Sequence, residues 1–120
     1  MYKRQGAYSP APVVTDEIHQ RIMNEVINPT VEGMAKEGHP YTGFLYAGLM
    51  ITADGTPKVI EYNCRFGDPE TQPMMLRLKS DLVELIEAAN REELDKTAIE
   101  FDPRAAVGVC LLYTSPSPRD

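Results

Sequence analysis

An acid, an amide and an arginine stand at alternate positions in the stretch Val59–Gln72, which reads VIEYNCRFGDPETQ. Its apolar start is typical of a β-strand, whose side chains point alternately to opposite faces. We therefore expect Glu61 and Asn63 on one face together with Val59, with the two polar residues roughly 6.5–7 Å apart along the backbone. Two oxygen ligands so placed suit a hard cation such as Mg²⁺. Arg65, at the C-terminal end of the strand, suits a phosphate group.

The same residues allow a purely structural interpretation. A salt bridge between Glu61 and Arg65 would also explain an acid and a cation on a buried hairpin, because burying either charge unpaired costs several kcal/mol. Spacing alone leaves both alternatives open, the metal–phosphate site and the salt bridge.

Composition narrows the class of protein. The chain has 120 residues, enough for one modest domain, and its 42% apolar and 25% charged residues are ordinary for a globular protein. Its net charge is −6 and its basic residues form no cluster, so neither nucleic acid nor a membrane surface is an expected partner. No apolar run is long enough to cross a bilayer, and the N-terminus lacks the apolar core of a signal peptide.

Several catalytic chemistries have no matching motif. The sequence contains no Gly-x-Gly-x-x-Gly fingerprint, no Walker-type phosphate loop and no nucleophile motif around its serines. Its two cysteines, Cys64 and Cys110, lie at neither zinc-ligand nor disulfide-framework spacing. A reducing, cytoplasmic location is the simplest interpretation.

The two ends of the chain differ in character from the rest. Met1–Gln5 is MYKRQ and Cys110–Asp120 is CLLYTSPSPRD. Suitable codons make these ends an inverted repeat, GTGTATAAGAGACA against TGTCTCTTATACAC, which resembles a transposon-type sequencing adapter read as protein. We therefore expect residues 1–5 and 110–120 to be adapter translation and residues 6–109 to be a native segment of a longer protein. The alternative is a real basic N-terminus and a Ser/Pro tail.

Two strands are expected to present the polar stretch. Thr42–Thr52 is apolar at both alternating sets of positions, which predicts a central strand covered on both faces. Asp54-Gly55 is a strong turn signal, so this strand and Lys58–Asn63 should form an antiparallel hairpin.

Helices are expected on both sides of this hairpin in the sequence. Thr15 is a good N-cap for an amphipathic helix that is kinked or restarted at Pro29 and ends at Gly38. Downstream, Asp68 and Ser80 are expected to cap two shorter helices, the first of which runs from Thr71 to about Leu78.

The outermost segments are expected to be a loop and a short strand. Gly6–Pro12 reads GAYSPAP, and its prolines predict an extended loop. Either this loop lines a substrate site with the hydroxyls of Tyr8 and Ser9, or it merely leads into the helix. Ala105–Val109 is expected to form the strand.

Four segments together resemble the phosphoribosylamine–glycine ligase family of the ATP-grasp superfamily: GAYSPAPVVT, YTGFLYAGLM, VIEYNCRFGDPETQ and KSDLVEL. The resemblance covers nearly all of residues 6–109, and the third segment is highly specific. It implies an α+β fold, namely the C-terminal part of an ATP-grasp domain with an antiparallel sheet and packed helices. It also implies that ATP, glycine and 5-phosphoribosylamine react through a glycyl phosphate to glycinamide ribonucleotide, ADP and phosphate, in de novo purine biosynthesis.

Carried over position by position, the resemblance gives the polar stretch its roles. Glu61 and Asn63 match the ligands of the Mg²⁺ or Mn²⁺ that bridges the ATP phosphates, and Arg65 matches a catalytic arginine that holds the transferred phosphate. Many ATP-grasp enzymes have another metal-binding acid on the preceding strand. Residues 43–51 contain none here, so Glu61 and Asn63 must carry more of the ligation.

The resemblance also assigns the substrate side. Asp68 lies in the loop expected near glycine or the amine, as a substrate-binding and catalytic residue, and Tyr8 and Ser9 belong to a substrate-binding loop. The alternatives are another ATP-grasp carboxylate–amine ligase or carboxylase, which the DPETQ motif argues against, and a non-catalytic nucleotide-binding fragment. The family's lysines and adenine-binding elements lie upstream of Gly6, so we expect this polypeptide alone to lack ligase activity and to fold poorly.

Overall fold

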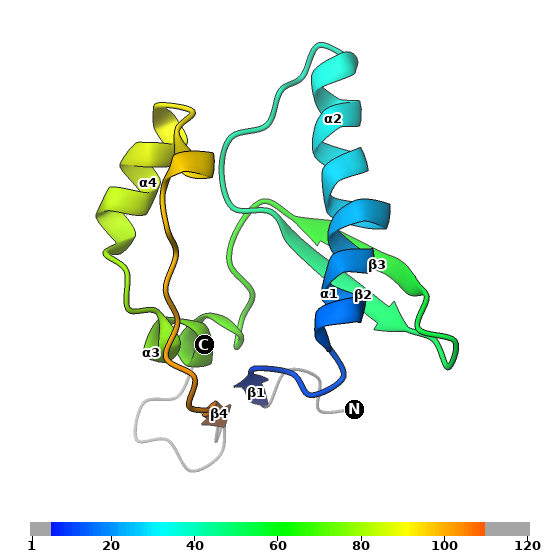
Figure 1. Ribbon diagram of the computed structural model, residues 1–120, viewed down its shortest axis with the longest axis vertical. Coiled ribbons are helices and arrows are strands. Elements are labelled where there is room, and N and C mark those ends of the chain that lie inside the picture. The colour runs from blue at the N-terminus through cyan, green and yellow to red at the C-terminus, as the bar shows by residue number, and fades with distance from the viewer. Residues whose placement is uncertain (1–5, 110–120) are drawn as a thin grey trace, which may run out of the picture. The chain divides into compact units, whose positions relative to one another are not determined.

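The computed structural model describes residues 6–109, which form helices and antiparallel strand pairs (Figure 1). They divide into two compact units, one of residues 6–10 with 67–109 and the other of Ala11–Phe66. The predicted α+β class is confirmed. The two ends that we expect to be adapter translation, residues 1–5 and 110–120, lie outside the described residues.

The unit Ala11–Phe66 begins with a long helical rod (Figure 1). Three helices follow one another along it: α1 over Asp16–Ile22, the π-helix η1 over Met23–Ile27, and α2 over Asn28–Lys36. Thr15 is the N-cap, as predicted, and its hydroxyl accepts a hydrogen bond of 3.3 Å from the backbone N–H of Ile18.

The π-helical turn has a local cause in Pro29. Proline lacks a backbone N–H, so it interrupts the α-helical hydrogen-bond pattern, and it lies in the first turn of α2. The preceding residue, Asn28, donates its N–H to the carbonyl of Met23, five residues back. The expected change at Pro29 is therefore confirmed, and the helix ends near Gly38, whose φ of +85° suits glycine.

A hairpin of β2 (Tyr46–Ile51) and β3 (Pro57–Asn63) follows, antiparallel as predicted. Its turn contains Gly55 at a φ of +76°. Helix α1 packs against this turn, because a Cβ on Gly55 would stand 3.0 Å from Cδ1 of Ile18. Arg21 adds a hydrogen bond of 3.3 Å from Nη1 to the carbonyl of Asp54. The rod thus holds the hairpin at its turn end.

The prediction of a central strand over Thr42–Thr52 is wrong in two respects. The strand begins only at Tyr46, since Gly43 has a φ of +148° and the hydroxyl of Tyr41 donates to the carbonyl of Phe44 at 2.9 Å. Within residues 6–109 it pairs with β3 alone, and Met50 is 58% exposed. Apolar residues on both faces indicate which side chains can be buried, but they do not identify the elements that cover them.

The other unit contains one strand pair and two helices. Strand β1 (Gly6–Ser9) pairs antiparallel with β4 (Ala106–Val109). Between them in the chain lie α3 over Thr71–Arg77, α4 over Leu82–Asn90 and the 3₁₀-helix η2 over Leu94–Lys96. The final strand was predicted. The predicted loop over Gly6–Pro12 is partly a strand, which the sequence did not indicate because its pairing partner lies about 100 residues away in the chain.

Both predicted caps in this unit are wrong by one or two residues. Helix α3 begins at Thr71, as predicted, but its N-cap is Glu70, and Asp68 lies in a turn next to a cis peptide bond to Pro69. Asp81, not Ser80, caps α4, because its carboxylate accepts from the N–H groups of Val83 and Glu84 at 2.7 and 3.2 Å. The hydroxyl of Ser80 instead accepts the N–H of Glu100 at 2.8 Å.

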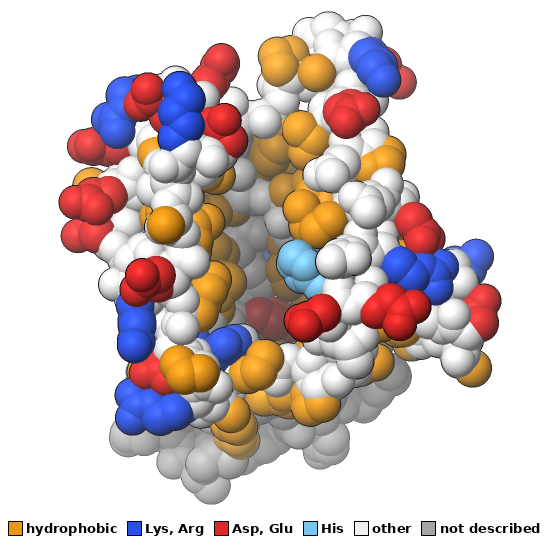
Figure 2. Space-filling model, in the orientation of Figure 1, with side chains coloured by type: hydrophobic (Ala, Val, Ile, Leu, Met, Phe, Trp, Pro, Cys, Tyr) orange, Lys and Arg blue, Asp and Glu red, His pale blue; other side chains and the backbone are white. Residues whose placement is uncertain are grey.

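Few side chains in the described residues are buried. Val26 is buried in one unit, and Leu85 and Ala88 in the other, while many large apolar side chains stay exposed. On the face in Figure 2, acidic, basic and apolar side chains are intermixed, without a broad field of one charge. No helix among residues 6–109 is long and apolar enough to cross a membrane.

Candidate functional site

Strand β3 places Glu61 and Asn63 on one face of the hairpin. Directly opposite residues of an antiparallel pair share a face, and here Glu61 lies opposite Gly48 while Asn63 lies opposite Tyr46. The residue between them, Tyr62, lies opposite Ala47 and therefore on the other face. The predicted juxtaposition of the carboxylate and the amide is confirmed.

Val59 does not share that face, contrary to the prediction. Gly48 pairs with Glu61 but the next residue, Leu49, pairs with Val59, so Ile60 is an extra residue in β3. Such a β-bulge shifts the alternation of side chains by one position. It places Val59 with Leu49, on the face opposite Glu61. A strict alternation read from sequence cannot detect this extra residue.

Arg65 lies beside Asn63 just beyond the end of β3. Its Nη2 donates to Oδ1 of Asn63 at 3.2 Å, and its Nη1 donates to the carbonyl of Phe66 at 2.8 Å. These two bonds fix the guanidinium next to the amide, while the side chain remains exposed. An exposed guanidinium held in this way is suited to bind a phosphate.

The alternative of a structural salt bridge between Glu61 and Arg65 is wrong for this geometry. The ion pairs found among residues 6–109 do not include Glu61, and no polar or charged side chain there is buried. The hairpin is exposed at Glu61, so there is no buried charge to neutralise. The acid is therefore available on the surface of the strand.

The oxygen atoms of Glu61 and Asn63 are chemically suited to a hard cation, but two side chains are too few to complete its coordination. Glu61 offers a carboxylate, and the amide oxygen of Asn63 has a second lone pair beside the one that faces Arg65. Residues 6–109 contain no group of three or more His, Cys, Asp or Glu side chains that could hold a metal ion. A cation bound here would need further oxygen ligands from water or phosphate.

Tyr8 and Ser9 lie on β1, in the other unit. The side chain of Tyr8 is exposed, and the hydroxyl of Ser9 accepts a hydrogen bond of 2.7 Å from Nη1 of Arg77. Asp68 belongs to the same unit and lies in the turn that precedes α3. The expected site residues thus form two groups, each described within its own unit.

Sequence reasoning missed Arg77. Its Nε donates to the carbonyl of Asp102 at 2.9 Å, and its guanidinium lies 5.7 Å from the ring centroid of Phe101, close enough for a cation–π contact. With the bond to Ser9, this one side chain joins three segments that are distant in the sequence. An arginine at the end of an apolar helix gives no local signal of such partners.

Two comparisons with known proteins bear on this site. The model of the phosphoribosylglycinamide synthetase ATP-grasp (A) domain matches residues 4–71. Over 106 residues the chain is 73% identical to the phosphoribosylamine–glycine ligase of Vibrio parahaemolyticus, 69% to that of Pseudomonas aeruginosa and 68% to that of Escherichia coli K12. Each alignment covers 88% of this chain but 25% of the relative, so the chain spans about a quarter of the length of these relatives.

Proposed function

Because this chain belongs to the phosphoribosylglycinamide synthetase ATP-grasp (A) domain family, we propose that it forms part of a phosphoribosylamine–glycine ligase. The complete protein would join glycine to 5-phosphoribosylamine through a glycyl phosphate and release glycinamide ribonucleotide, ADP and phosphate. It would act on small molecules in de novo purine biosynthesis in the cytoplasm. The observation that carries this proposal is the identity of 67–73% to proteins of that name, together with Glu61, Asn63 and Arg65 at the end of β3.

Glu61 and Asn63 are the residues that would hold a divalent cation, Mg²⁺ or Mn²⁺. They share one face of the hairpin, on which Glu61 is exposed and Asn63 half-buried, and they offer a carboxylate and an amide oxygen, the donors that hard cations prefer. A bound cation of this kind neutralises negative charge on the phosphates of ATP. The strand itself contributes rigidity, because β2 fixes both residues through backbone pairing.

Arg65 would hold the phosphoryl group that passes from ATP to glycine. Phosphoryl transfer asks little covalent chemistry of the protein and depends on positioning and charge stabilisation. The bonds of Arg65 to Asn63 and Phe66 orient its guanidinium before any substrate arrives. We therefore assign the positive charge at the reacting phosphate to this residue.

Asp68, Tyr8 and Ser9 would serve the glycine or amine side. Asp68 is exposed in a turn three residues after Arg65, and a carboxylate there suits an ammonium or hydroxyl group. Tyr8 and Ser9 supply hydroxyls from β1, and Arg77 fixes the orientation of the second. These assignments follow the family resemblance residue by residue.

The test is a substrate screen with the complete protein that contains this segment. ADP release should require both glycine and 5-phosphoribosylamine and should yield glycinamide ribonucleotide, identified by mass spectrometry. ADP release with a different carboxylate or amine, but not with this pair, would assign the protein to another ATP-grasp reaction. Nucleotide binding without turnover under any of these conditions would overturn the catalytic role.

A further inference from the structure

The backbone pairing of the hairpin ends before the chain reaches Arg65. Tyr46 and Asn63 are the last paired residues, and residues 64–66 continue in irregular backbone. Arg65 is exposed there, and its Nη1 donates to the carbonyl of the next residue, Phe66, at 2.8 Å. The guanidinium is therefore only as well placed as the carbonyl that it binds. Contacts other than strand pairing must hold Phe66.

The ring of Phe66 packs against the ring of Phe44. Their centroids are 4.0 Å apart, and the planes of the two rings are inclined at 36°. Phe66 is half-buried, whereas Phe44 is 39% exposed. Aromatic rings in contact attract each other beyond the effect of the area that they bury. Because Phe44 precedes β2 and Phe66 follows β3, this contact joins the two segments at the open end of the hairpin.

Phe44 is in turn fixed by its own loop. The hydroxyl of Tyr41 donates to the carbonyl of Phe44 at 2.9 Å. Gly43, between them, has a φ of +148°, and a Cβ there would stand 3.0 Å from the same hydroxyl oxygen. Glycine therefore suits this position, because it lets the loop fold closely around the hydroxyl of Tyr41. The backbone from which the ring of Phe44 projects is thus held in place.

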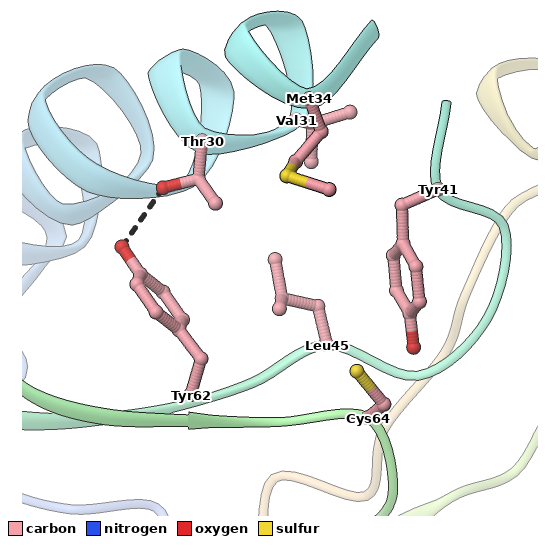
Figure 3. A pocket seen from close by; sticks show the side chains of 7 residues that line it. All are labelled: Thr30, Val31, Met34, Tyr41, Leu45, Tyr62 and Cys64. Carbon is pink, nitrogen blue, oxygen red and sulfur yellow. Dashed lines mark hydrogen bonds between the residues drawn. The ribbon is translucent and has the colours of Figure 1, made fainter. Parts of the chain in front are cut away.

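A second side-chain contact joins the same two segments. Tyr41 and Cys64 line one hollow, and Figure 3 shows them extending into it from the loop before β2 and from the end of β3. A hydrogen bond with Cys64 raises the pKa of Tyr41. The loop before β2 and the segment after β3 therefore stay together beyond the last backbone pair, through the contacts of Tyr41 with Cys64 and of Phe44 with Phe66.

We propose that the aromatic pair of Phe44 and Phe66 positions the guanidinium of Arg65 for phosphoryl transfer, an inference that rests on the phosphate-binding role proposed above for Arg65. Phe44 acts through Phe66, whose carbonyl accepts the hydrogen bond from Arg65. Phosphoryl transfer depends on positioning and charge stabilisation, and a misplacement of about 1 Å can cost about 100-fold in rate. Phe44 and Phe66 are therefore positioning residues.

The experiment compares two substitutions of Phe44 in the complete protein that contains this segment. Phe44→Leu removes the ring but keeps an apolar side chain, so kcat for the formation of glycinamide ribonucleotide should fall about tenfold with little change in KM for glycine. Phe44→Tyr keeps the ring and is the matched control. Its kcat should stay within about twofold of the unsubstituted protein, because a partly exposed ring has room for a hydroxyl.

A double substitution separates positioning from general damage. Arg65→Met alone should lower kcat by about 100-fold or more, because it removes the positive charge at the transferred phosphate. Adding Phe44→Leu to Arg65→Met should lower kcat no further, since the group that Phe44 positions is then absent. If Phe44 only supported the fold, the effects of the two substitutions on kcat would multiply.

A second measurement needs no turnover. In protein made with isotope-labelled arginine, the Nη protons of Arg65 should give separate NMR signals at low temperature, because the bonds to Phe66 and Asn63 restrict rotation of the guanidinium. The loss of these signals in Arg65→Met assigns them. They should merge into one averaged signal in Phe44→Leu and stay separate in Phe44→Tyr.

Three results would overturn the proposal. The first is that Phe44→Leu and Phe44→Tyr have the same kcat. The second is that Phe44→Leu lowers kcat by the same factor with Arg65 and with Met at that position. The third is that the Nη signals of Arg65 are already averaged in the unsubstituted protein. If the complete protein makes no glycinamide ribonucleotide, the proposed function fails, while the Nη signals still test whether the aromatic pair holds Arg65.

Discussion

Gly48 leaves the space that the side chain of Glu61 occupies. The two residues face each other across the hairpin, and a Cβ on Gly48 would stand only 3.0 Å from Cγ of Glu61. A contact that short is tighter than nine in ten real Cβ contacts, so the neighbour would have to move by a few tenths of an ångström, and the crowded atom is near the root of the glutamate side chain. Glycine at this position therefore leaves Glu61 room to lie across the partner strand.

The first prediction is that Gly48→Ala weakens cation binding in the complete protein. The added methyl group should push Glu61 into another rotamer and raise the Mg²⁺ concentration needed for half-maximal activity about tenfold, a change of roughly 1.4 kcal/mol. Gly33→Ala is the matched control, because a Cβ there meets nothing within 4 Å. It should leave the Mg²⁺ dependence unchanged and stabilise α2 by about 0.5–1 kcal/mol.

The second prediction concerns Glu61 directly. Glu61→Gln removes the negative charge of the proposed cation ligand, so turnover by the complete protein should fall by about 100-fold or more. The melting temperature should stay nearly constant, because Glu61 is exposed. Glu37→Gln, on the exposed end of α2, serves as the control for a lost surface charge. Near-normal turnover of Glu61→Gln would remove the metal role from this residue.

The third prediction tests Arg77 as a residue that positions Ser9. Arg77→Lys keeps the charge but removes the planar guanidinium, which donates hydrogen bonds to both Ser9 and Asp102. The free energy of unfolding should therefore fall by about 1–3 kcal/mol. In the complete protein KM for the amine or glycine should rise more than kcat falls. Arg91→Lys is the control, since its bonds to Glu87 and Glu93 are exposed and worth at most about 1 kcal/mol. Equal effects of the two substitutions would contradict a specific role for Arg77.

The fourth prediction is a pH dependence of the hairpin turn. Hydrogen bonds from Thr52 and Thr56 hold the pKa of Asp54 at about 2, below its usual 3.8. A lowered folded pKa means that the stabilisation is complete above about pH 4 and is lost as the pH falls towards 2. Amide exchange at Gly55 should therefore accelerate in that range.

The control for this pH effect is Asp54→Asn. In this variant the protection of the Gly55 amide, expressed relative to its intrinsic exchange rate, should not change between about pH 4 and pH 2. Arg104 also lowers the pKa of Asp102, but this acid lies in the other unit. A local probe at Gly55 separates the two titrations. An unchanged exchange rate of the unsubstituted protein from pH 4 to 2 would show that the turn does not depend on the ionised Asp54.

The fifth prediction concerns residues 1–5 and 110–120. If both are adapter translation, the coding DNA of the two ends should form the inverted repeat that their peptides permit. Sequencing the source DNA checks this at once, with the codons of residues 6–109 as the internal reference. Codons that do not form the repeat would favour a real basic N-terminus and a Ser/Pro tail.

Local signals in the sequence were sufficient for much of the fold. Thr15 as an N-cap, the change at Pro29 and the turn at Asp54-Gly55 each depend on residues within a few positions of one another. The same holds for Glu61 and Asn63, because alternation along a short stretch of strand decides their common face. These features are encoded where they occur.

Features that depend on distant residues were not predictable in this way. The pairing of β1 with β4 and the contact of Arg77 with Ser9 join positions 68 or more residues apart. The bulge at Ile60 depends on how Leu49 and Val59 meet across the hairpin, which alternation within one strand does not reveal. Caps were misplaced where two adjacent candidates compete, as Ser80 and Asp81 do, and tertiary bonding to Glu100 decides between them.

The hairpin has a consequence for handling the 120-residue chain. Within the described residues, β2 and β3 pair only with each other, so the outer edge of each strand has no neighbouring strand there. Such edges are templates on which a second chain can add its own strand, and the apolar residues of β2 favour that addition. Self-association of this chain should therefore rise steeply with concentration, and light scattering over a dilution series would measure it.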